Sequence, residues 1–182
     1  YHWWADPVRA LVEIRRVLSP GGRLLLATPA VHLRGGLRLP FVVRWPGVVN
    51  RGGNSRALLS QVDLLSSLAR LTGQRLKQAD APDSVDVLPA LRGGSEAGRS
   101  HLVEQAGALS IISGDWKYIE PRAGRAILLE TNTELGNAPQ PQLYNLAEDI
   151  GERRNLAAQH PERVRELAEA LQRIREEGRT RH

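Results

Sequence analysis

The strongest constraint on the fold comes from the second half of the sequence, where the spacing of apolar residues indicates strands and then a helix. Five short runs with strand-forming side chains are separated by turn residues, at positions 101–105, 109–112, 116–119, 126–129 and 142–146. A helix then begins at Pro161 and ends at Gly178. The apolar residues of this helix share one face and are Val164, Leu167, Ala168, Leu171 and Ile174. We expect a small antiparallel sheet of about four strands covered by this helix.

The middle of the sequence contains one clear amphipathic helix, which ends at Gly73. Its apolar stripe is formed by residues at helical spacing, namely Leu58, Val62, Leu65, Leu68 and Leu71. The preceding glycine- and proline-rich stretch, residues 29–54, is expected to be a loop with a short strand at 41–43. Residues 74–99 are polar and interrupted by proline and glycine, so we expect a surface connection there. It includes a small apolar cluster of Val85, Val87 and Leu88.

The first 31 residues predict one helix followed by one strand. Asp6 can cap a helix that starts at Pro7. Residues 23–27 form a short apolar run of the kind that is typical of a strand buried on both faces. This alternation indicates one step of a layered α/β sheet, so the chain as a whole is predicted to belong to the α/β class.

Composition excludes several kinds of site. The chain has no cysteine, which removes disulfides, thiolate metal sites and thiol nucleophiles. Its 25 basic and 20 acidic residues give a net charge of +5, but they are interspersed, so no nucleic-acid partner is expected. No apolar run is long enough for a membrane span. Because methionine is absent and the first residue is Tyr1, we expect a piece of a longer protein.

The residues alone reveal no catalytic constellation. The five histidines are not spaced as metal ligands on one helical face, and neither a phosphate-binding glycine loop nor a nucleophile elbow is present. Asp80, Asp83 and Asp86 recur every third residue around Pro82, a pattern compatible with a calcium site or with a turn-rich loop. Turn chemistry favours the loop.

Four short motifs, in order, resemble the C-terminal part of the sulfatase family. The first is Arg34-Gly-Gly-Leu-Arg-Leu-Pro-Phe-Val-Val-Arg-Trp-Pro-Gly47, which is similar to the family's Glu-Gly-Gly-x-Arg-Val-Pro-Phe-x-x-x-Trp-Pro-Gly. The others are Ser60-Gln-Val-Asp-Leu-Leu65, Gly114-Asp-Trp-Lys-Tyr-Ile119 and Gln142-Leu-Tyr-Asn-Leu-Ala-Glu-Asp149 with the following Gly151-Glu152 and Asn155-Leu-Ala157. The resemblance covers about residues 34–182 and implies the C-terminal portion of an alkaline-phosphatase-like fold.

The resemblance implies an arylsulfatase-like sulfuric ester hydrolase, with sulfate ester hydrolysis by the complete enzyme. Sulfatases of this kind use a formylglycine, made from the cysteine or serine of a Cys/Ser-x-Pro/Ala-x-Arg motif, and a calcium ion held by the N-terminal half and the middle of the protein. Neither the motif nor the metal ligands map onto this chain, so no catalytic residue, metal site or cofactor is assigned to it. Arg34 replaces the family's glutamate, the active-site lysine just before it is absent, and Ile150 replaces a proline. We therefore expect the chain to be inactive alone and a sulfate ester to bind only in the complete enzyme, which would be periplasmic or secreted if it follows bacterial sulfatases.

Residues 1–31 resemble the late part of a class I methyltransferase that uses S-adenosylmethionine. The matching residues are His2-Trp-Trp-Ala-Asp-Pro7, then Leu11, Glu13, Arg16-Val-Leu18, Pro20-Gly-Gly-Arg-Leu-Leu25 and Thr28-Pro29. We therefore expect a chimeric junction between Val31 and Arg34. The predicted organisation is a methyltransferase-like segment at 1–33, the end of a sulfatase catalytic domain at 34–99, and an antiparallel-sheet subdomain with a terminal helix at 100–182. A methyltransferase-related protein and a non-catalytic interaction module remain the alternatives.

Three residues are candidates for binding an anionic substrate. Arg38 could face the substrate or brace its own loop, and Arg99 and His101 enter the first strand of the terminal sheet, where they could line a cleft. Trp116 and Tyr118 alternate along a strand and are expected to lie beneath the last helix. Lys117, between them, is expected to be solvated.

Overall fold

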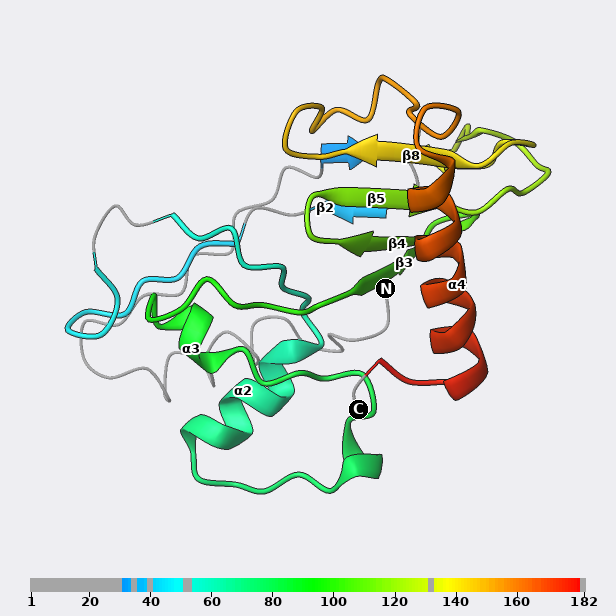
Figure 1. Ribbon diagram of the computed structural model, residues 1–182. Helices are drawn as coiled ribbons and strands as arrows, with labels where there is room; N and C mark the ends of the chain where they lie inside the picture. The colour runs from blue at the N-terminus through cyan, green and yellow to red at the C-terminus, as the bar shows by residue number, and fades with distance from the viewer. Residues whose placement is uncertain (1–30, 34–35, 39–40, 51–53, 131–132, 181–182) are drawn as a thin grey trace.

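A computed structural model describes residues 31–33, 36–38, 41–50, 54–130 and 133–180 (Figure 1). The helix and strand expected within residues 7–27 lie outside this described part. So does much of the expected loop at 29–54.

The C-terminal half contains the predicted four-stranded antiparallel sheet. Its strands are β3 (Leu102–Gln105), β4 (Leu109–Ser113), β5 (Trp116–Ile119) and β8 (Gln142–Asn145), in the order β3-β4-β5-β8. The β4–β5 hairpin turns at Gly114, whose φ of 55° lies in the left-handed region that glycine tolerates. The register aligns Ile111 with Tyr118 and Tyr118 with Leu143, which makes one apolar row across three strands.

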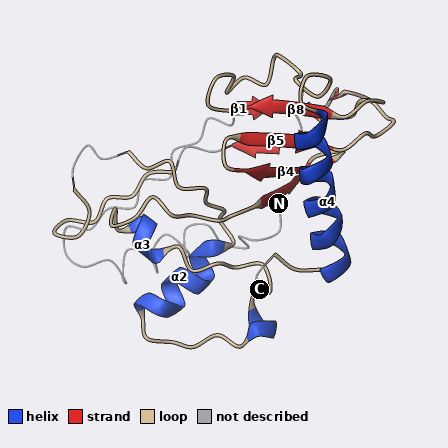
Figure 2. Cartoon of the chain, in the orientation of Figure 1, coloured by secondary structure: helices blue, strands red, loops and turns tan. Residues whose placement is uncertain are grey.

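Helix α4 (Pro161–Glu177) covers the face of the sheet that carries this row (Figure 2). Leu167, Ala170 and Leu171 are buried against Ile111, Tyr118 and Leu143. The remaining predicted stripe residues, Val164, Ala168 and Ile174, pack around them. Proline stands in the first turn and Gly178, with φ 64°, caps the end, as the sequence predicts. Trp116 and Tyr118 also lie beneath this helix, which confirms their predicted placement.

The opposite face of the sheet is covered as well. Ala108, Ile119 and Tyr144 form a second buried cluster there, with Leu146 packed against it. Because strand side chains alternate between faces, Lys117 and Ile119 must lie on this second face when Trp116 and Tyr118 lie on the first. The sheet is therefore an internal layer along β5.

Two short hairpins accompany the sheet. The run expected at 126–129 forms β6 (Ile127–Leu128), which pairs with β7 (Thr133–Glu134) and does not join the main sheet. Within the expected loop, β1 (Val31–Leu33) pairs with β2 (Gly36–Arg38). The strand expected at 41–43 is wrong, since only Val42 forms an isolated bridge.

The middle of the chain contains α2 (Asp63–Leu71), the 3-10 turn η1 (Gln78–Asp80) and α3 (Leu88–Leu91). Helix α2 begins later than the apolar pattern from Leu58 suggests, and Gly73 follows it with φ 72°. Its buried residues are polar ones, Asp63, Ser66 and Ser67, while the apolar stripe is exposed.

The expectation that residues 74–99 form only a surface connection is wrong. Ser84, Val87, Leu88 and Arg99 are buried, because this segment packs against the polar side of α2 and accepts or donates hydrogen bonds there. The predicted apolar cluster at Val87 and Leu88 is part of this contact. Within the described helices, none is both long and apolar enough to span a membrane.

Candidate functional site

Arg99, one of the predicted substrate-binding residues, is the centre of a buried polar network. Arg99 lies in the loop before β3, and only 7% of the residue is exposed to solvent. One guanidinium nitrogen, Nη1, pairs with the carboxylate of Asp63 and donates to the Asp83 carbonyl at 2.9 Å. Nη2 donates to the Thr180 hydroxyl at 2.7 Å, and Nε donates to the His101 carbonyl at 3.0 Å. The Arg99 fork therefore ties together four separate segments of this protein.

Asp63 is the acidic partner in this network, and it also starts helix α2. The side chain is fully buried. One carboxylate oxygen accepts the Ser60 N–H at 2.8 Å, and the other accepts the Val85 N–H at 2.9 Å as well as the arginine. An acid in the first turn also suits the positive end of the helix dipole. The motif residues Ser60 and Asp63 thus have a structural role here, because they fix where the helix begins.

The other two predicted site residues lie in different places. His101 is partly exposed just before β3, its backbone is held by Arg99, and its Nδ1 lies 3.1 Å from the Ser100 hydroxyl. Arg38 is the last residue of β2 and pairs across the hairpin with Val31. Arg99 and His101 are two residues apart in the chain and share a hydrogen bond. Arg38 belongs to a separate hairpin.

Lys117 is fully buried, so the expectation of a solvated strand residue is wrong. Its Nζ lies 3.1 Å from Glu152 Oε1 and 3.6 Å from Glu104 Oε2. Glu152 is itself fully buried and adopts a positive φ of 53° in the turn after β8. A buried ammonium needs anionic partners to offset its desolvation, and the two glutamates supply them. This group joins β3, β5 and the turn that bears the Gly151-Glu152 motif.

Sequence reasoning missed several members of these two networks. Asp63 and Glu152 appeared only as parts of motifs, and Glu104 and Thr180 were not singled out. One signal was available: an acidic residue inside the apolar pattern of the middle helix and a lysine between two core aromatics are charges in positions where solvent is excluded.

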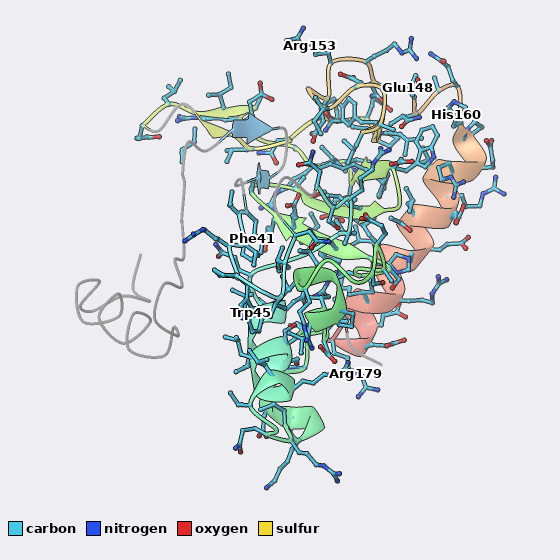
Figure 3. All side chains as sticks on the ribbon, turned by 90° about the vertical axis from the view of Figure 1, so that its left-hand side faces the viewer. Phe41, Trp45, Glu148, Arg153, His160 and Arg179 are labelled. Carbon is cyan, nitrogen blue, oxygen red and sulfur yellow. The ribbon has the colours of Figure 1, made fainter. Side chains whose placement is uncertain are left out.

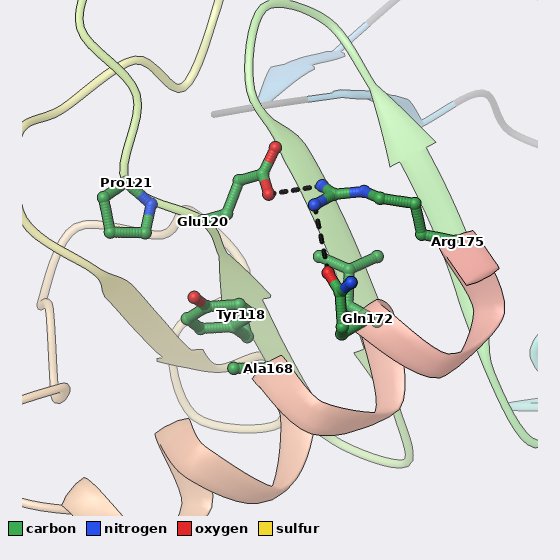
Figure 4. Close-up of a pocket in the computed structure, with 7 residues that line it drawn as sticks. Tyr118, Glu120, Pro121, Ala168, Gln172 and Arg175 are labelled. Carbon is green, nitrogen blue, oxygen red and sulfur yellow. Dashed lines mark hydrogen bonds and ion pairs between the residues drawn. The ribbon is translucent and has the colours of Figure 1, made fainter.

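A small cavity of about 290 Å³ lies between the end of β5 and helix α4 (Figure 4). Tyr118, Ala168 and Leu171 line its apolar side, and a 2.6 Å ion pair between Glu120 and Arg175 closes its polar side. Burial raises the pKa of the Tyr118 hydroxyl above 10.0; the nearby Glu120 carboxylate adds to this, and Arg175 opposes it. The hydroxyl therefore stays protonated at neutral pH.

The acidic and histidine side chains of the described residues do not gather into a metal site. Among them, no group of three or more histidine, aspartate or glutamate side chains could hold an ion. Each of the three aspartates in the 80–86 loop has a different partner. The Asp80 carboxylate accepts the Lys77 N–H, the Asp83 carboxylate accepts the Thr180 N–H, and the Asp86 carboxylate forms an ion pair with Arg70 at 2.5 Å. The calcium that the resemblance implies for the complete enzyme has no ligand set in this part of the chain. The contacts that the structure does show, around Arg99 and Lys117, hold neighbouring segments together.

Most of this chain is similar in sequence to known sulfatases. An N-acetylgalactosamine-6-O-sulfatase of Bacteroides thetaiotaomicron is 46% identical over 142 residues, which is 77% of this chain and 28% of that protein. Arylsulfatase A of Bos taurus is 31% identical over 178 residues, 87% of this chain and 34% of that protein. The chain therefore spans only about a third of these relatives or less.

A comparison with solved structures also finds sulfatases. A protein from a study of glycosaminoglycan metabolism by Bacteroides thetaiotaomicron matches with 44% identity and a TM-score of 0.71, over 78% of this chain and 32% of that one. A 2-O GAG sulfatase matches in fold, with 23% identity and a TM-score of 0.55, over 76% of this chain and 29% of that one. A different family, described as "Methyltransferase domain", matches residues 1–26. The larger part of this chain is therefore homologous to sulfatases, over a stretch consistent with the C-terminal portion of those proteins.

Proposed function

We propose that this chain serves as the C-terminal portion of a sulfuric ester hydrolase of the arylsulfatase type, acting on a sulfate ester in the complete enzyme. The observation that carries the proposal is the 46% identity to a sulfatase over 77% of the chain. In that enzyme the chain contributes a rigid scaffold. Its two buried ionic networks, around Arg99 and around Lys117, hold the sulfatase motifs in fixed positions relative to the sheet.

The nucleophile and the metal belong, in this proposal, to the part of a sulfatase that the chain does not match. The family suggests formylglycine and calcium for full-length members, and the described residues offer neither a nucleophile motif nor an ion-binding group. When bound, calcium would neutralise negative charge on a sulfuryl group. The chain alone is expected to be inactive.

Within the chain, we assign substrate binding to Arg38 and His101, with Arg99 acting as a positioning residue for His101. All three guanidinium nitrogens of Arg99 contact groups of this protein, whereas His101 is partly exposed and receives its backbone support from Arg99. In the complete enzyme, His101→Gln should raise KM with little change in unfolding free energy. Arg99→Lys should instead lower the unfolding free energy, because a lysine cannot reproduce the fork.

The substrate class follows from the same homology. The relative named as an N-acetylgalactosamine-6-O-sulfatase favours a 6-O-sulfated N-acetylgalactosamine unit over a simple aryl sulfate. A comparison of sulfate release from the two kinds of ester by the complete enzyme would test this assignment. Equal or faster turnover of the aryl ester would contradict it.

The central experiment measures sulfate release in calcium, first by this chain alone and then by this chain combined with the unmatched part of the 46% identical relative, matured to carry formylglycine. We expect turnover only from the combined protein. Turnover by the chain alone would overturn the assignment of the chemistry to the missing part. A well-formed combined protein without turnover would overturn the proposed activity. A combined protein whose formylglycine precursor is left unconverted provides the inactive control.

A second candidate function rests on the methyltransferase match to residues 1–26. On our proposal those residues belong to a segment at 1–33 joined to the sulfatase-like parts at 34–99 and 100–182 through a junction between Val31 and Arg34. A calorimetric titration with S-adenosylmethionine separates the candidates, because tight stoichiometric binding would favour the methyltransferase. Genomic DNA read across the codons for residues 28–36 would test the junction: a continuous reading frame there would support a single gene.

A further inference from the structure

Helix α2 exposes its apolar side and buries its polar side. Val62, which precedes the helix, is 50% exposed, and the helical residues Leu65, Leu68 and Leu71 are 52%, 52% and 40% exposed. We refer to these four residues as the α2 stripe. An amphipathic helix of a self-contained domain turns such a stripe toward its core. The arrangement seen here is the reverse of that rule.

The orientation of the helix is fixed by hydrogen bonds on its polar side. The Ser66 N–H donates to the Ser84 hydroxyl at 2.9 Å, and the Ser67 hydroxyl accepts the Val87 N–H at 3.0 Å. Asp63 adds its buried pairing with Arg99. Rotating the helix to bury the stripe would leave these buried polar groups without partners, which is costly. The hydrogen bonds on the polar side of α2 therefore keep the α2 stripe exposed to solvent.

The neighbouring segment extends the apolar surface. Phe41 and Val42 are 45% and 42% exposed. Phe41 and Trp45 lie along one edge of the molecule (Figure 3), and Val48 of the same segment lines a hollow together with Arg70 of α2. Exposed apolar side chains gathered in this way mark an interaction surface more often than isolated ones do.

We propose that the α2 stripe is the docking face for the part of a sulfatase that this chain does not match. The proposal rests on the proposed function. The chain matches 28% of one sulfatase relative and 32% of a related solved chain, so most of such a protein is available as the occupant. The stripe itself carries no charge, and Arg70 of the same helix is paired with Asp86, so the complementary surface is apolar. The Arg99 network then couples this docking face rigidly to His101 and to the end of α4.

Labelling of single cysteines tests the proposal, because the chain has none of its own. Leu68→Cys places a thiol in the stripe, and Leu129→Cys places one at a leucine that is 75% exposed and lies in the β6–β7 region. Each variant is treated with a maleimide, alone and after combination with the unmatched part of the 46% identical relative. Mass spectrometry of this chain's own peptides gives the labelling rates. Combination should slow labelling at position 68 at least about 100-fold and leave position 129 unchanged.

Two results would overturn the proposal. In the first, the two polypeptides fail to associate; in the second, they associate but the labelling rate at position 68 does not change. Protection of position 68 in the chain alone, with a dimeric mass in sedimentation, would instead assign the stripe to a second copy. The labelling readout is independent of turnover, so protection without sulfate release would sustain the docking face while contradicting the proposed activity.

Discussion

The sheet–helix unit at residues 102–178 and the helical region at residues 58–99 use the same kind of amphipathic helix in opposite ways. In the first, the stripe of α4 is buried against the apolar row of the sheet. In the second, the stripe of α2 is exposed and serines and an aspartate make the internal contacts. Apolar burial is the larger stabilising term in most domains. The first region therefore has its own core, whereas the second is one half of a contact.

The difference also shows in how charge is used. Both regions contain a buried ion pair, Lys117 with Glu152 and Arg99 with Asp63. In the sheet–helix unit the pair sits on a layer that is already covered on both faces by apolar side chains. In the helical region the pair and the neighbouring hydrogen bonds join the polar side of α2 to the segment that carries Ser84, Val87 and Arg99. Four predictions, ordered from the largest expected effect to the smallest, should sharpen or break this contrast.

The largest effect is expected for Lys117→Met. The variant leaves the buried Glu152 and the mostly buried Glu104 without their shared cation, so the free energy of unfolding should fall by about 4 kcal/mol. Lys77→Met, at the only other lysine and at an exposed position, is the matched control and should change stability by less than about 0.5 kcal/mol. Urea titration followed by circular dichroism measures both. Equal effects would mean that the buried group is dispensable.

A pair of leucine truncations compares the two helices directly. Leu167→Ala removes a side chain that is 1% exposed in the core under α4, and it should cost about 3 kcal/mol. Leu68→Ala, at a residue that is 52% exposed on α2, should cost less than about 1 kcal/mol in the chain alone. The same urea titration applies. A loss at position 68 as large as that at position 167 would show that the α2 stripe already has a partner within the chain.

Local pattern was sufficient to predict the first region and insufficient for the second. Hairpin-linked strands and one covering helix need only near neighbours in sequence, so the strands at 102–119 and the bounds of α4 follow from periodicity and caps. The helix at 63–71 was also predictable, but the side that it buries depends on hydrogen bonds to residues 84–87. Arg99 meets Asp63 and Thr180 across 36 and 81 residues of sequence, and no local pattern carries that information. Lys117 was misjudged for the same reason, since Glu152 lies 35 residues away.

A smaller effect is expected at the point where the two regions are joined. Thr180→Val removes the hydroxyl that accepts from Arg99 and lies 3.1 Å from Asp83, so the unfolding free energy should fall by about 1 kcal/mol. Thr72→Val is the control, because that exposed hydroxyl bonds only to carbonyls of its own helix at 3.0 and 3.1 Å. Thermal unfolding of the two variants would be compared. A neutral Thr180→Val would mean that the connection to the C-terminal residues adds no stability.

The smallest effect concerns pH. Burial raises the pKa of Tyr118, so the native state holds the phenolic proton more tightly than the unfolded state does. This contribution to stability is fully present below the ordinary tyrosine pKa near 10.0 and is lost as pH rises through the higher native value. Tyr118→Phe should therefore flatten the fall in stability at alkaline pH. Absorbance at 295 nm follows the titration, and a Tyr118 midpoint at or below 10.0 would contradict the assignment.

Hydrogen exchange of the backbone amides in the chain alone is the most direct test of the contrast between a complete core and half of a contact. Amides in β4, β5 and α4 should exchange at least about 100-fold more slowly than those of α2, because they open only when the core of the sheet–helix unit opens. Equal protection of α2 and α4 would contradict this account, since it would place both helices in one cooperative core.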